Sequence, residues 1–337
     1  MGPGAAAGPR GRDAQEHRAA VLAVDHPGAV RGEHECGPLV VTGGSVSARQ
    51  HGSLTWLVLP ALVFFTAFGL VPLVGVLLLS FTSWNGIGEI TPIGFENWAA
   101  VLSDPGLVHS LGVTFLIMAL SWLVQTPLSI LVGVFISGQH RYRAVLAVLF
   151  FTPLLLSSAA IAITYKALLD PNFGLGASLG IPFLVQNWLG DPVLAIATVV
   201  FVVSWQFIPF HSLIYQGAVR QIPASLYEAS RIDGAGRIRQ FFSITLPQLK
   251  YTMITSSTMI VAGSMTLFDL IFVLTLGGPS DATRVLALDM YLRGFRGNMM
   301  GPASVIALII VVVAVLLAMG VQRLGGKDAS ESRLEGA

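Results

Sequence analysis

The sequence contains few charged residues for its length. Asp, Glu, Lys and Arg together make up 11% of the 337 residues, whereas hydrophobic residues make up 54%. A soluble domain carries about 25% charged residues, so this chain could not cover the surface of a soluble globule. Disorder over most of the length is also excluded, because it requires low hydrophobicity and high net charge. The composition predicts an integral membrane protein.

Other features that the sequence lacks exclude further classes of protein. The formal net charge of +1 provides no basic face for nucleic acid. A single cysteine, Cys36, excludes an intramolecular disulfide framework and a cysteine-rich metal site. No G-x4-G-K-[ST] phosphate loop, no H-E-x-x-H motif and no credible Ser-His-Asp arrangement occurs. We therefore expect a non-enzyme without a metal or cofactor.

Six stretches are long and apolar enough to cross the hydrocarbon core as helices, which takes about 20 residues. They are Leu54–Ser80, Ser110–Gln139, Ala144–Tyr165, Pro192–Phe210 (continuing toward Gly217), Met253–Leu276 and Gly297–Gln322. Their continuous apolar character favours helices over the alternating segments of a β-barrel. The sequence predicts an all-α integral membrane protein with a six-helix transmembrane domain over residues 51–324.

The positions of Lys and Arg predict the orientation of the spans. Fifteen of them lie before the first span, after the second, between the fourth and fifth, or after the sixth. The opposite side carries four, Lys166, Arg284, Arg293 and Arg296. Because basic loops favour the cytoplasm, we expect both termini to be cytoplasmic, in the plasma or inner membrane.

Two predicted tails flank the spans, residues 1–50 and 325–337. The first is rich in Gly, Ala, Pro and Arg without periodicity, which is typical of disorder. Its longest apolar run is too short for a secretory signal. An alternative of equal weight is that translation begins near Val46 and that the preceding residues are not made. Neither the disordered tail nor the later start assigns this segment a function.

The loop between the fourth and fifth spans, residues 219–250, is unusually long and amphipathic. Pro223 suits the first turn of a helix, and Gly234 and Gly236 suit its end. Pro247 is predicted to end a second helix. The apolar stripes of the two helices are Leu226, Ala229 and Ile232, then Ile238, Phe241 and Phe242. Such a pair could simply lie among lipid headgroups.

The spacing within this loop resembles a known motif. Glu228-Ala229, then Gly234, and then Ile244, Leu246 and Pro247 match the EAA loop (E-A-A-x3-G-x9-I-x-L-P) of binding-protein-dependent ABC permeases, with Ser230 in place of the third residue. QIPASLYEASRIDGAG, FDLIFVLTLGGPSDAT and MMGPASVIALII are similar to segments of sugar-type (MalF-like or UgpA-like) permease subunits, with departures at Leu276 and Pro302. The resemblance covers roughly Leu54–Arg323.

This resemblance implies a type I ABC importer permease. Its EAA loop would dock as a coupling helix on a separate cytoplasmic ATPase, present in two copies. Glu228 would be the charged anchor, Ala229 and Ser230 would allow close approach, and Gly234 would set the bend, with Asp233 as a further ATPase-coupling residue. Ile244, Leu246 and Pro247 would hold the loop against the bundle, and Gly277, Gly278 and Pro279 would form an external loop.

The resemblance also implies the partners and the cargo. A second, related permease would complete the pore in the lipid membrane, and an extracytoplasmic solute-binding protein would deliver a carbohydrate or oligosaccharide. Glycerol-phosphate-like solutes are an alternative cargo.

Polar residues within the spans are candidates for the substrate path. They are Gln125, Ser204, Trp205, Gln206, His211 and Asp269. A charge such as Asp269 is costly in a membrane and defaults to a functional role. Asp269 lies 19 residues after Lys250, or about 28 Å along a helix, which places it near the outer membrane interface. A structural or gating role there is as compatible with the sequence as contact with the substrate. Each of the others could instead serve helix–helix packing.

A secondary transporter driven by an ion gradient is the rival hypothesis. Such a protein is expected to contain internal repeats and paired ionisable residues within its spans. Asp269 has no partner charge in any predicted span, so the importer is favoured.

Overall fold

The computed structural model describes residues 55–138 and 141–325. The chain divides into two units, Met1–Leu57 and Val58–Ala337, and nearly all described residues belong to the second. Except for Gly325, the predicted tails lie outside the described residues. The regular secondary structure of the described part is helical apart from one antiparallel pair of strands, β1 (Thr82–Ser83) and β2 (Thr91–Pro92).

Four helical segments of the described part are long and apolar enough to cross a membrane. They are Val58–Leu79, Pro105–Ile136, Pro192–Gln221 and Met300–Arg323. The first combines α1 (Thr55–Phe65), the π-helical turn η1 (Thr66–Leu70) and α2 (Val71–Leu79), and the others are α4, α8 and α15. A fifth span is present if the bent pair α5–α6 counts as one. Of the six predicted spans, the third and the fifth are thus interrupted.

The third predicted span is bent by 96°. It consists of α5 (Arg141–Phe151), a 3-10 turn η2 (Thr152–Leu155) and α6 (Ser158–Leu168). Pro153 lies in the 3-10 turn, and the Ser157 hydroxyl accepts the Ala160 N–H at 3.2 Å as the N-cap of α6. Proline disfavours helical backbone before it, and Ser is a preferred N-cap, so a new helix begins here in a new direction.

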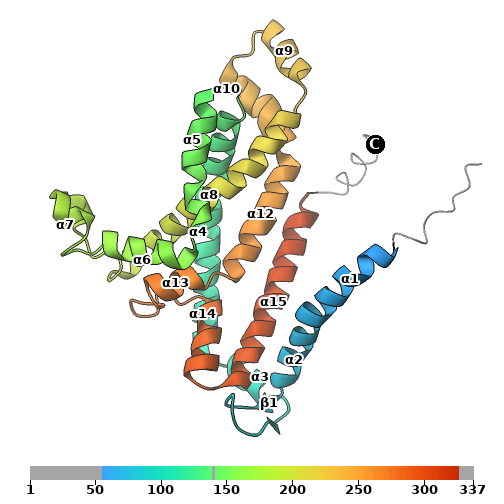
Figure 1. Ribbon diagram of the computed structural model, residues 1–337, viewed down its shortest axis with the longest axis vertical. Coiled ribbons are helices and arrows are strands. Elements are labelled where there is room, and N and C mark those ends of the chain that lie inside the picture. The colour runs from blue at the N-terminus through green and yellow to red at the C-terminus, as the bar shows by residue number, and fades with distance from the viewer. Residues whose placement is uncertain (1–54, 139–140, 326–337) are drawn as a thin grey trace, which may run out of the picture. The chain divides into compact units, whose positions relative to one another are not determined.

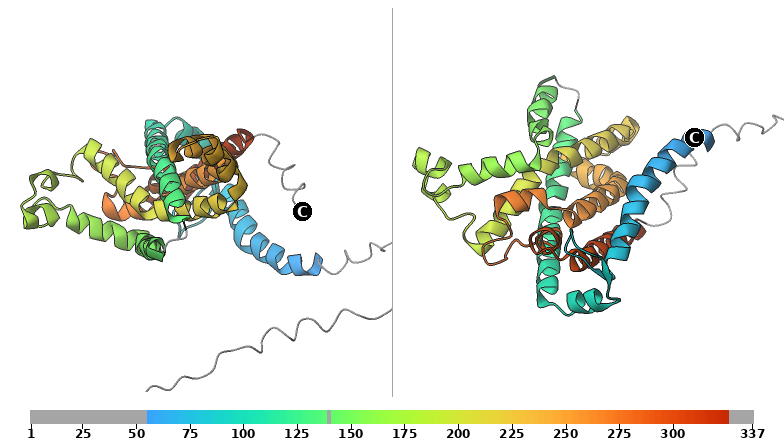
Figure 2. Two further views of the ribbon diagram at one scale, coloured as in Figure 1. Left: turned by 90° about the horizontal axis from the view of Figure 1, so that it is seen from above. Right: turned by 60° about the horizontal axis from the view of Figure 1, so that its bottom comes forward.

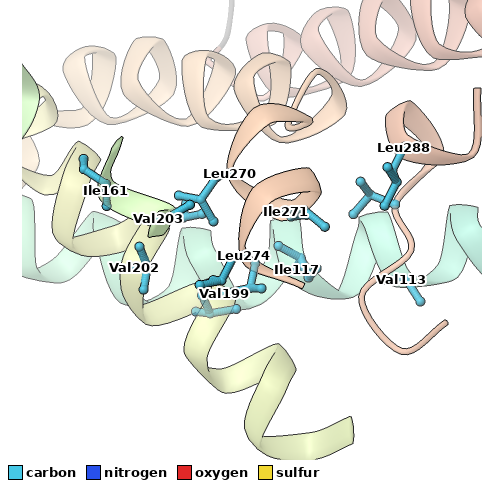
Figure 3. Packing of buried hydrophobic residues seen from close by; sticks show 13 residues of the cluster. Val113, Ile117, Ile161, Val199, Val202, Val203, Leu270, Ile271, Leu274 and Leu288 are labelled. Carbon is cyan, nitrogen blue, oxygen red and sulfur yellow. The ribbon is translucent and has the colours of Figure 1, made fainter. Parts of the chain in front are cut away.

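The fifth predicted span ends early. Helix α12 (Lys250–Met265) has 16 residues, and a turn at 266–268 separates it from α13 (Asp269–Leu274). Sixteen residues measure about 24 Å, less than the hydrocarbon core of about 30 Å. In α13, Leu270, Ile271 and Leu274 are buried against α4, α6 and α8 (Figure 3). Other parts of the protein, rather than lipid, cover the apolar residues of α13. Hydropathy alone cannot distinguish residues buried in protein from residues that face lipid.

Helices α4 and α8 form the centre of the described unit. Each begins at an Asp-Pro pair: Asp104 accepts the Gly106 N–H at 2.8 Å, and Asp191 accepts two N–H groups at 2.9 Å. A Cβ at Gly133 would lie 2.7 Å from Cβ of Tyr215 and 2.9 Å from the carbonyl oxygen of Ser212. Gly133 therefore permits the close crossing of the two helices.

Two prolines follow π-helical turns. Pro72 comes just after η1, and Pro247 lies in α11 (Leu246–Gln248) just after the π turn η4 (Phe241–Thr245). Proline lacks the N–H of a regular helix and its ring clashes with the carbonyl four residues earlier; a π turn widens the helix at that point. The prediction that Pro247 ends a helix is therefore wrong, because the chain stays helical through it.

The short elements lie at the ends and the side of the helical unit. They are α3 (Glu96–Leu102), α7 (Leu175–Leu179), η3 (Pro182–Leu184), α9 (Ala224–Ile232), α10 (Arg237–Gln240), α14 (Leu286–Tyr291) and the π turn η5 (Leu292–Arg296). Helix α9 lies at one end, and β1, α3 and α14 lie at the other (Figure 1). Two further views show α6 and α7 extending away from α12 and α15 (Figure 2).

Candidate functional site

A cavity of about 500 Å³ lies where α12 is interrupted. Residues of α4, α6, α8, α12 and α13 and of the turn before α13 line it. Its polar lining consists of Gln125, Ser158, His211, Ser264, Thr266 and Asp269, and its aromatic lining of Phe207, Phe210 and Phe268. The cavity therefore combines hydrogen-bonding groups with aromatic rings, and among its lining residues only Asp269 is acidic and none is Lys or Arg.

Three of the six predicted substrate-path residues meet in this cavity. Gln125 is 2% exposed and His211 is 4% exposed. His211 Nδ1 lies 2.9 Å from the Ser256 hydroxyl, which fixes the ring against α12. Asp269 is exposed and begins α13, so it lies at the interruption rather than inside a continuous span. A helix N-terminus favours a carboxylate there.

The other three predicted residues lie outside the cavity lining. Trp205 faces a second, apolar groove and makes an edge contact of 5.4 Å between ring centroids with Tyr165. Ser204 is buried. Gln206 donates to the Ser158 hydroxyl at 3.1 Å, so it supports the cavity wall from behind.

Sequence reasoning missed several lining residues. Ser158, Ser264 and Thr266 reach the cavity because α6 begins anew at Ser157 and α12 stops at Met265. The available signals were Pro153 with its following Ser pair, and the charge of Asp269 within an apolar run. Both indicate breaks, and chain breaks within a membrane domain are tolerated where they line a cavity.

The predicted coupling loop forms a helical hairpin at the α9 end of the unit. Gly234, with φ of +75°, ends α9 in the left-handed region, where a residue with a Cβ is disfavoured. Glu228, Ala229 and Asp233 are all exposed. The stripe predicted on α9 is not covered by the described part of the chain, because Ile232 is 87% exposed and Leu226 40%.

Polar contacts set the angle between α9 and the following segment. The Tyr227 hydroxyl lies 2.9 Å from the Thr245 hydroxyl. The Ser230 hydroxyl donates to the Tyr227 carbonyl and accepts from Gln240 Nε2, both at 2.9 Å. Ser230, the one departure from the EAA pattern, thus makes two hydrogen bonds, of which an alanine could make neither.

The end of the loop packs on α4 and α8. Leu246 is half-buried against a small core of Ile130, Tyr215 and Leu249. Ile244 is half-buried, whereas Pro247 is exposed. We predicted that all three residues hold the loop against the bundle. Leu246 makes such a contact. For Ile244 the role stays a prediction, and the exposure of Pro247 does not support it there.

The Gly277–Pro279 loop is closed by hydrogen bonds. Gly277 has φ of +89°, and its carbonyl accepts the Thr283 N–H at 3.1 Å. The Thr283 hydroxyl donates to the Gly278 carbonyl at 2.8 Å. The Gly278–Pro279 peptide bond is cis. His109 Nε2 lies 3.0 Å from the carbonyl oxygen of Asp281, which ties the loop to α4.

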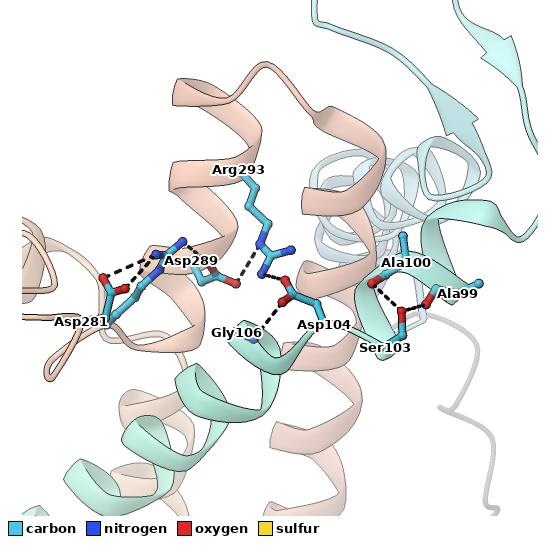
Figure 4. Close-up of polar contacts among 9 residues, drawn as sticks. Ala99, Ala100, Ser103, Asp104, Gly106, Asp281, Asp289 and Arg293 are labelled. Atoms are coloured by element: carbon cyan, nitrogen blue, oxygen red, sulfur yellow. Dashed lines mark hydrogen bonds and ion pairs between the residues drawn. The ribbon is translucent and has the colours of Figure 1, made fainter.

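An ion-pair network that the sequence did not indicate lies at the end opposite α9 (Figure 4). Asp289, 1% exposed, accepts from Arg284 at 2.6 Å and from Arg293 at 3.0 Å. Arg293 also pairs with Asp104, and Arg284 with Asp281 at 3.4 Å. We call Asp104, Asp289, Arg284 and Arg293 the external clamp, after the side of the membrane on which the sequence predicts Arg284 and Arg293 to lie. The clamp joins the start of α4 to α14 and η5.

Two residues of the clamp, Asp104 and Arg293, have shifted pKa values. The Gly106 N–H, followed by Arg293, lowers the pKa of Asp104 below its ordinary value. Burial opposes the charge of Arg293, but its hydrogen bonds to Asp289 and Asp104 outweigh burial and raise its pKa. The sequence shows the Asp-Pro pair at the start of α4 and three Arg in one loop, but no local pattern indicates that these residues pair. In the described ranges, no group of three or more His, Cys, Asp and Glu could hold a metal ion.

The chain belongs to the family described as binding-protein-dependent transport system inner membrane component, which matches residues 109–328. It is 32% identical to the probable ABC transporter permease protein YurN of Bacillus subtilis, over 77% of this chain and 91% of that protein. It is 29% identical to the multiple sugar-binding transport system permease protein MsmF of Streptococcus mutans, over 79% and 92%.

A solved structure shares the fold. It is a bacterial ABC transporter involved in the import of the acidic polysaccharide alginate, with a TM-score of 0.71 and 22% identity over 81% of this chain and 94% of that one. The predicted fold class, an all-α type I ABC importer permease, is confirmed, although the described helices give four or five spans rather than six.

Proposed function

We propose that this protein is the permease subunit of a bacterial ABC importer that forms half of a translocation pore for carbohydrates or oligosaccharides. The observation that carries the proposal is α9, a nine-residue helix that presents Glu228 to solvent at one end of the helical unit. A helix so exposed, with uncovered Leu226 and Ile232 beside an acidic side chain, is suited to a partner protein. Family membership supports this interpretation over the ion-gradient transporter.

The cavity lining supports a neutral sugar as cargo. Amide, hydroxyl and imidazole groups can hydrogen-bond sugar hydroxyls, and the faces of Phe207, Phe210 and Phe268 provide apolar surface. A glycerol-phosphate-like solute would need cationic groups, and the lining residues include no Lys or Arg. The relative MsmF, named for multiple sugars, points to the same class. Gln125, His211 and Asp269 are the proposed contacts.

Coupling follows from the rigidity of the loop. The hydrogen bonds among Tyr227, Ser230 and Gln240 hold α9 at a fixed angle to the segment that continues into α12. A push on Glu228 and the exposed face of α9 is therefore transmitted to α12, whose far end borders the cavity at Ser264 and Thr266. In this way closure of a bound ATPase pair would alternate the access of the cavity.

The remaining partners belong to the same proposal. A second, related permease completes the pore, two copies of an ATPase subunit hydrolyse ATP, and an extracytoplasmic solute-binding protein delivers the sugar. Both termini face the cytoplasm with α9. Arg220, Arg237 and Arg239 lie in the segments flanking α9, in agreement with the preference of basic residues for the cytoplasmic side. The external clamp and the Gly277–Pro279 loop face outward.

Glu228→Arg tests the proposal in the full transporter, reconstituted in vesicles and loaded with ATP. We expect loss of ATP-dependent uptake across a panel of labelled oligosaccharides and loss of ATPase co-purification, because the anchor charge is reversed. Glu89→Arg makes the same charge change on an exposed residue between β1 and β2 and should leave both intact. Undiminished uptake and ATPase association in Glu228→Arg would refute the coupling role of α9.

A further inference from the structure

A third cavity lies along α12 and has a volume of about 800 Å³. It is distinct from the cavity that Gln125, His211 and Asp269 line and from the groove beside Trp205. We call it the α12 groove. It follows α12 from Lys250 to Val261, and residues of α4, α11 and α15 form its walls. Its lining is apolar, with Met118, Met253, Ile254 and Leu324 as typical members, and Lys250 is its only charged residue.

The polarity of the α12 groove changes along its length. At the Val261 end, the Trp122 indole N–H donates to the Ser257 hydroxyl at 2.8 Å, so that donor is satisfied within the wall. At the other end, Lys250 is exposed, and within the described ranges its ammonium makes no ion pair and lies 5.9 Å from the centre of the Tyr251 ring. The groove is therefore apolar inside and cationic at its mouth.

The length of the α12 groove matches one leaflet of a bilayer. Lys250 and Val261 are separated by eleven helical residues, or about 16 Å, and half of the hydrocarbon core is about 15 Å. A transmembrane helix of a partner would need a surface about twice as tall. Residues 326–337 contain one large apolar residue, Leu334, and could not fill an apolar groove.

We infer that the α12 groove binds an anionic phospholipid of the cytoplasmic leaflet. An acyl chain occupies the apolar part, and the phosphate of the headgroup pairs with Lys250 at its mouth. The charge fits this source, since the cytoplasmic leaflet carries the anionic lipids that attract basic residues. The inference takes from the proposed function only that the α9 end faces the cytoplasm. A lipid seated here contacts Leu246 and Pro247 of the coupling loop.

Photolabelling of the assembled transporter in phosphatidylcholine nanodiscs tests this inference. The probes are phosphatidylglycerol and phosphatidylcholine, each with a diazirine near the end of one acyl chain, and labelled peptides are identified by mass spectrometry. We expect phosphatidylglycerol to label peptides containing Trp122 and residues 253–261, and phosphatidylcholine to label them about fivefold less. Lys250→Gln should remove that preference, whereas Arg239→Gln, on the same side but outside the groove, should keep it.

A second variant tests the groove without changing Lys250, in case Lys250→Gln alters labelling indirectly. Ile254→Trp fills the groove, and it should reduce labelling by both probes while uptake of sugar is measured in parallel. Equal labelling by both headgroups, a preference that survives Lys250→Gln, or labelling unaffected by Ile254→Trp would each overturn the inference. Because labelling is read separately from uptake, its failure would leave the proposed transport function standing.

Discussion

The two ends of the helical unit use charge in opposite ways. At the external clamp, Asp289 is buried and accepts hydrogen bonds from two arginines. At α9, Glu228 and Asp233 are exposed, and the polar contacts that hold the helix run between neutral side chains of its own loop. Charge satisfied within the chain fixes geometry, whereas charge left in solvent is available to a partner. We therefore expect the clamp to hold its end of the unit without a partner, and α9 to be the end that binds one.

The largest expected effect comes from breaking the clamp. Asp289→Ala leaves Arg284 and Arg293 without their buried partner, and removal of one member of a buried pair costs about 3–5 kcal/mol. Arg284 and Arg293 keep some water contact, at 27% and 16% exposed, so the loss should fall toward the lower value. The melting temperature of the purified transporter measures it.

Asp281→Ala is the matched control for the clamp. Asp281 contacts Arg284 at 3.4 Å and is 58% exposed, and exposed ion pairs contribute little. The melting temperature should therefore change little. Equal losses in Asp289→Ala and Asp281→Ala would contradict the view that the buried pair holds this end of the unit.

A smaller effect is expected at the coupling end. Gly234→Ala forces a residue with a Cβ to adopt φ of +75°, at a cost of about 1–2 kcal/mol. Gly236→Ala is the control, because Gly236 has φ of −72°. Neither added Cβ would have an atom within 4 Å, so the two variants differ in backbone conformation alone.

The readout for this pair separates function from stability. Gly234→Ala should reduce ATP-dependent uptake and increase hydrogen exchange in residues 224–232, with little change in melting temperature, whereas Gly236→Ala should behave as wild type. If both variants lost uptake equally, the left-handed turn would not be what orients α9.

The smallest expected effect is a pH dependence of the clamp. Because the native pKa of Asp104 is lowered, the ionised carboxylate stabilises the native state above its unfolded pKa of about 3.9. That contribution disappears as the pH falls through the lower native pKa. Between about pH 5 and about pH 3, the wild-type melting temperature should fall more than that of Asp104→Asn. Parallel pH profiles would mean that Asp104 does not stabilise the clamp.

Several features of the fold were predictable from local sequence. Asp-Pro pairs mark the starts of α4 and α8, Gly234 marks the end of α9, and long apolar runs mark the spans. The interruption between α12 and α13 was not predictable from hydropathy, because Leu270 and Ile271 are as apolar as lipid-facing residues although the protein buries them. Gln125, His211 and Asp269 could be selected from the sequence as candidates because large polar groups are rare in spans, and the structure places all three in one cavity. Trp205 could not be excluded by the same reasoning, since its orientation depends on how α8 packs.

The sequence by itself determined the membrane class of this protein, most of its helices and the spacing of its EAA loop, because these depend on contacts and propensities within a few turns of helix. Only the tertiary structure decided which polar residues share a cavity and which charges pair. Arg293 and Asp104 are 189 residues apart, and the break before Asp269 is useful only because α6 and α8 lie across from it. Such contacts form only when helices that are distant in the sequence pack together, so no local sequence pattern predicts them.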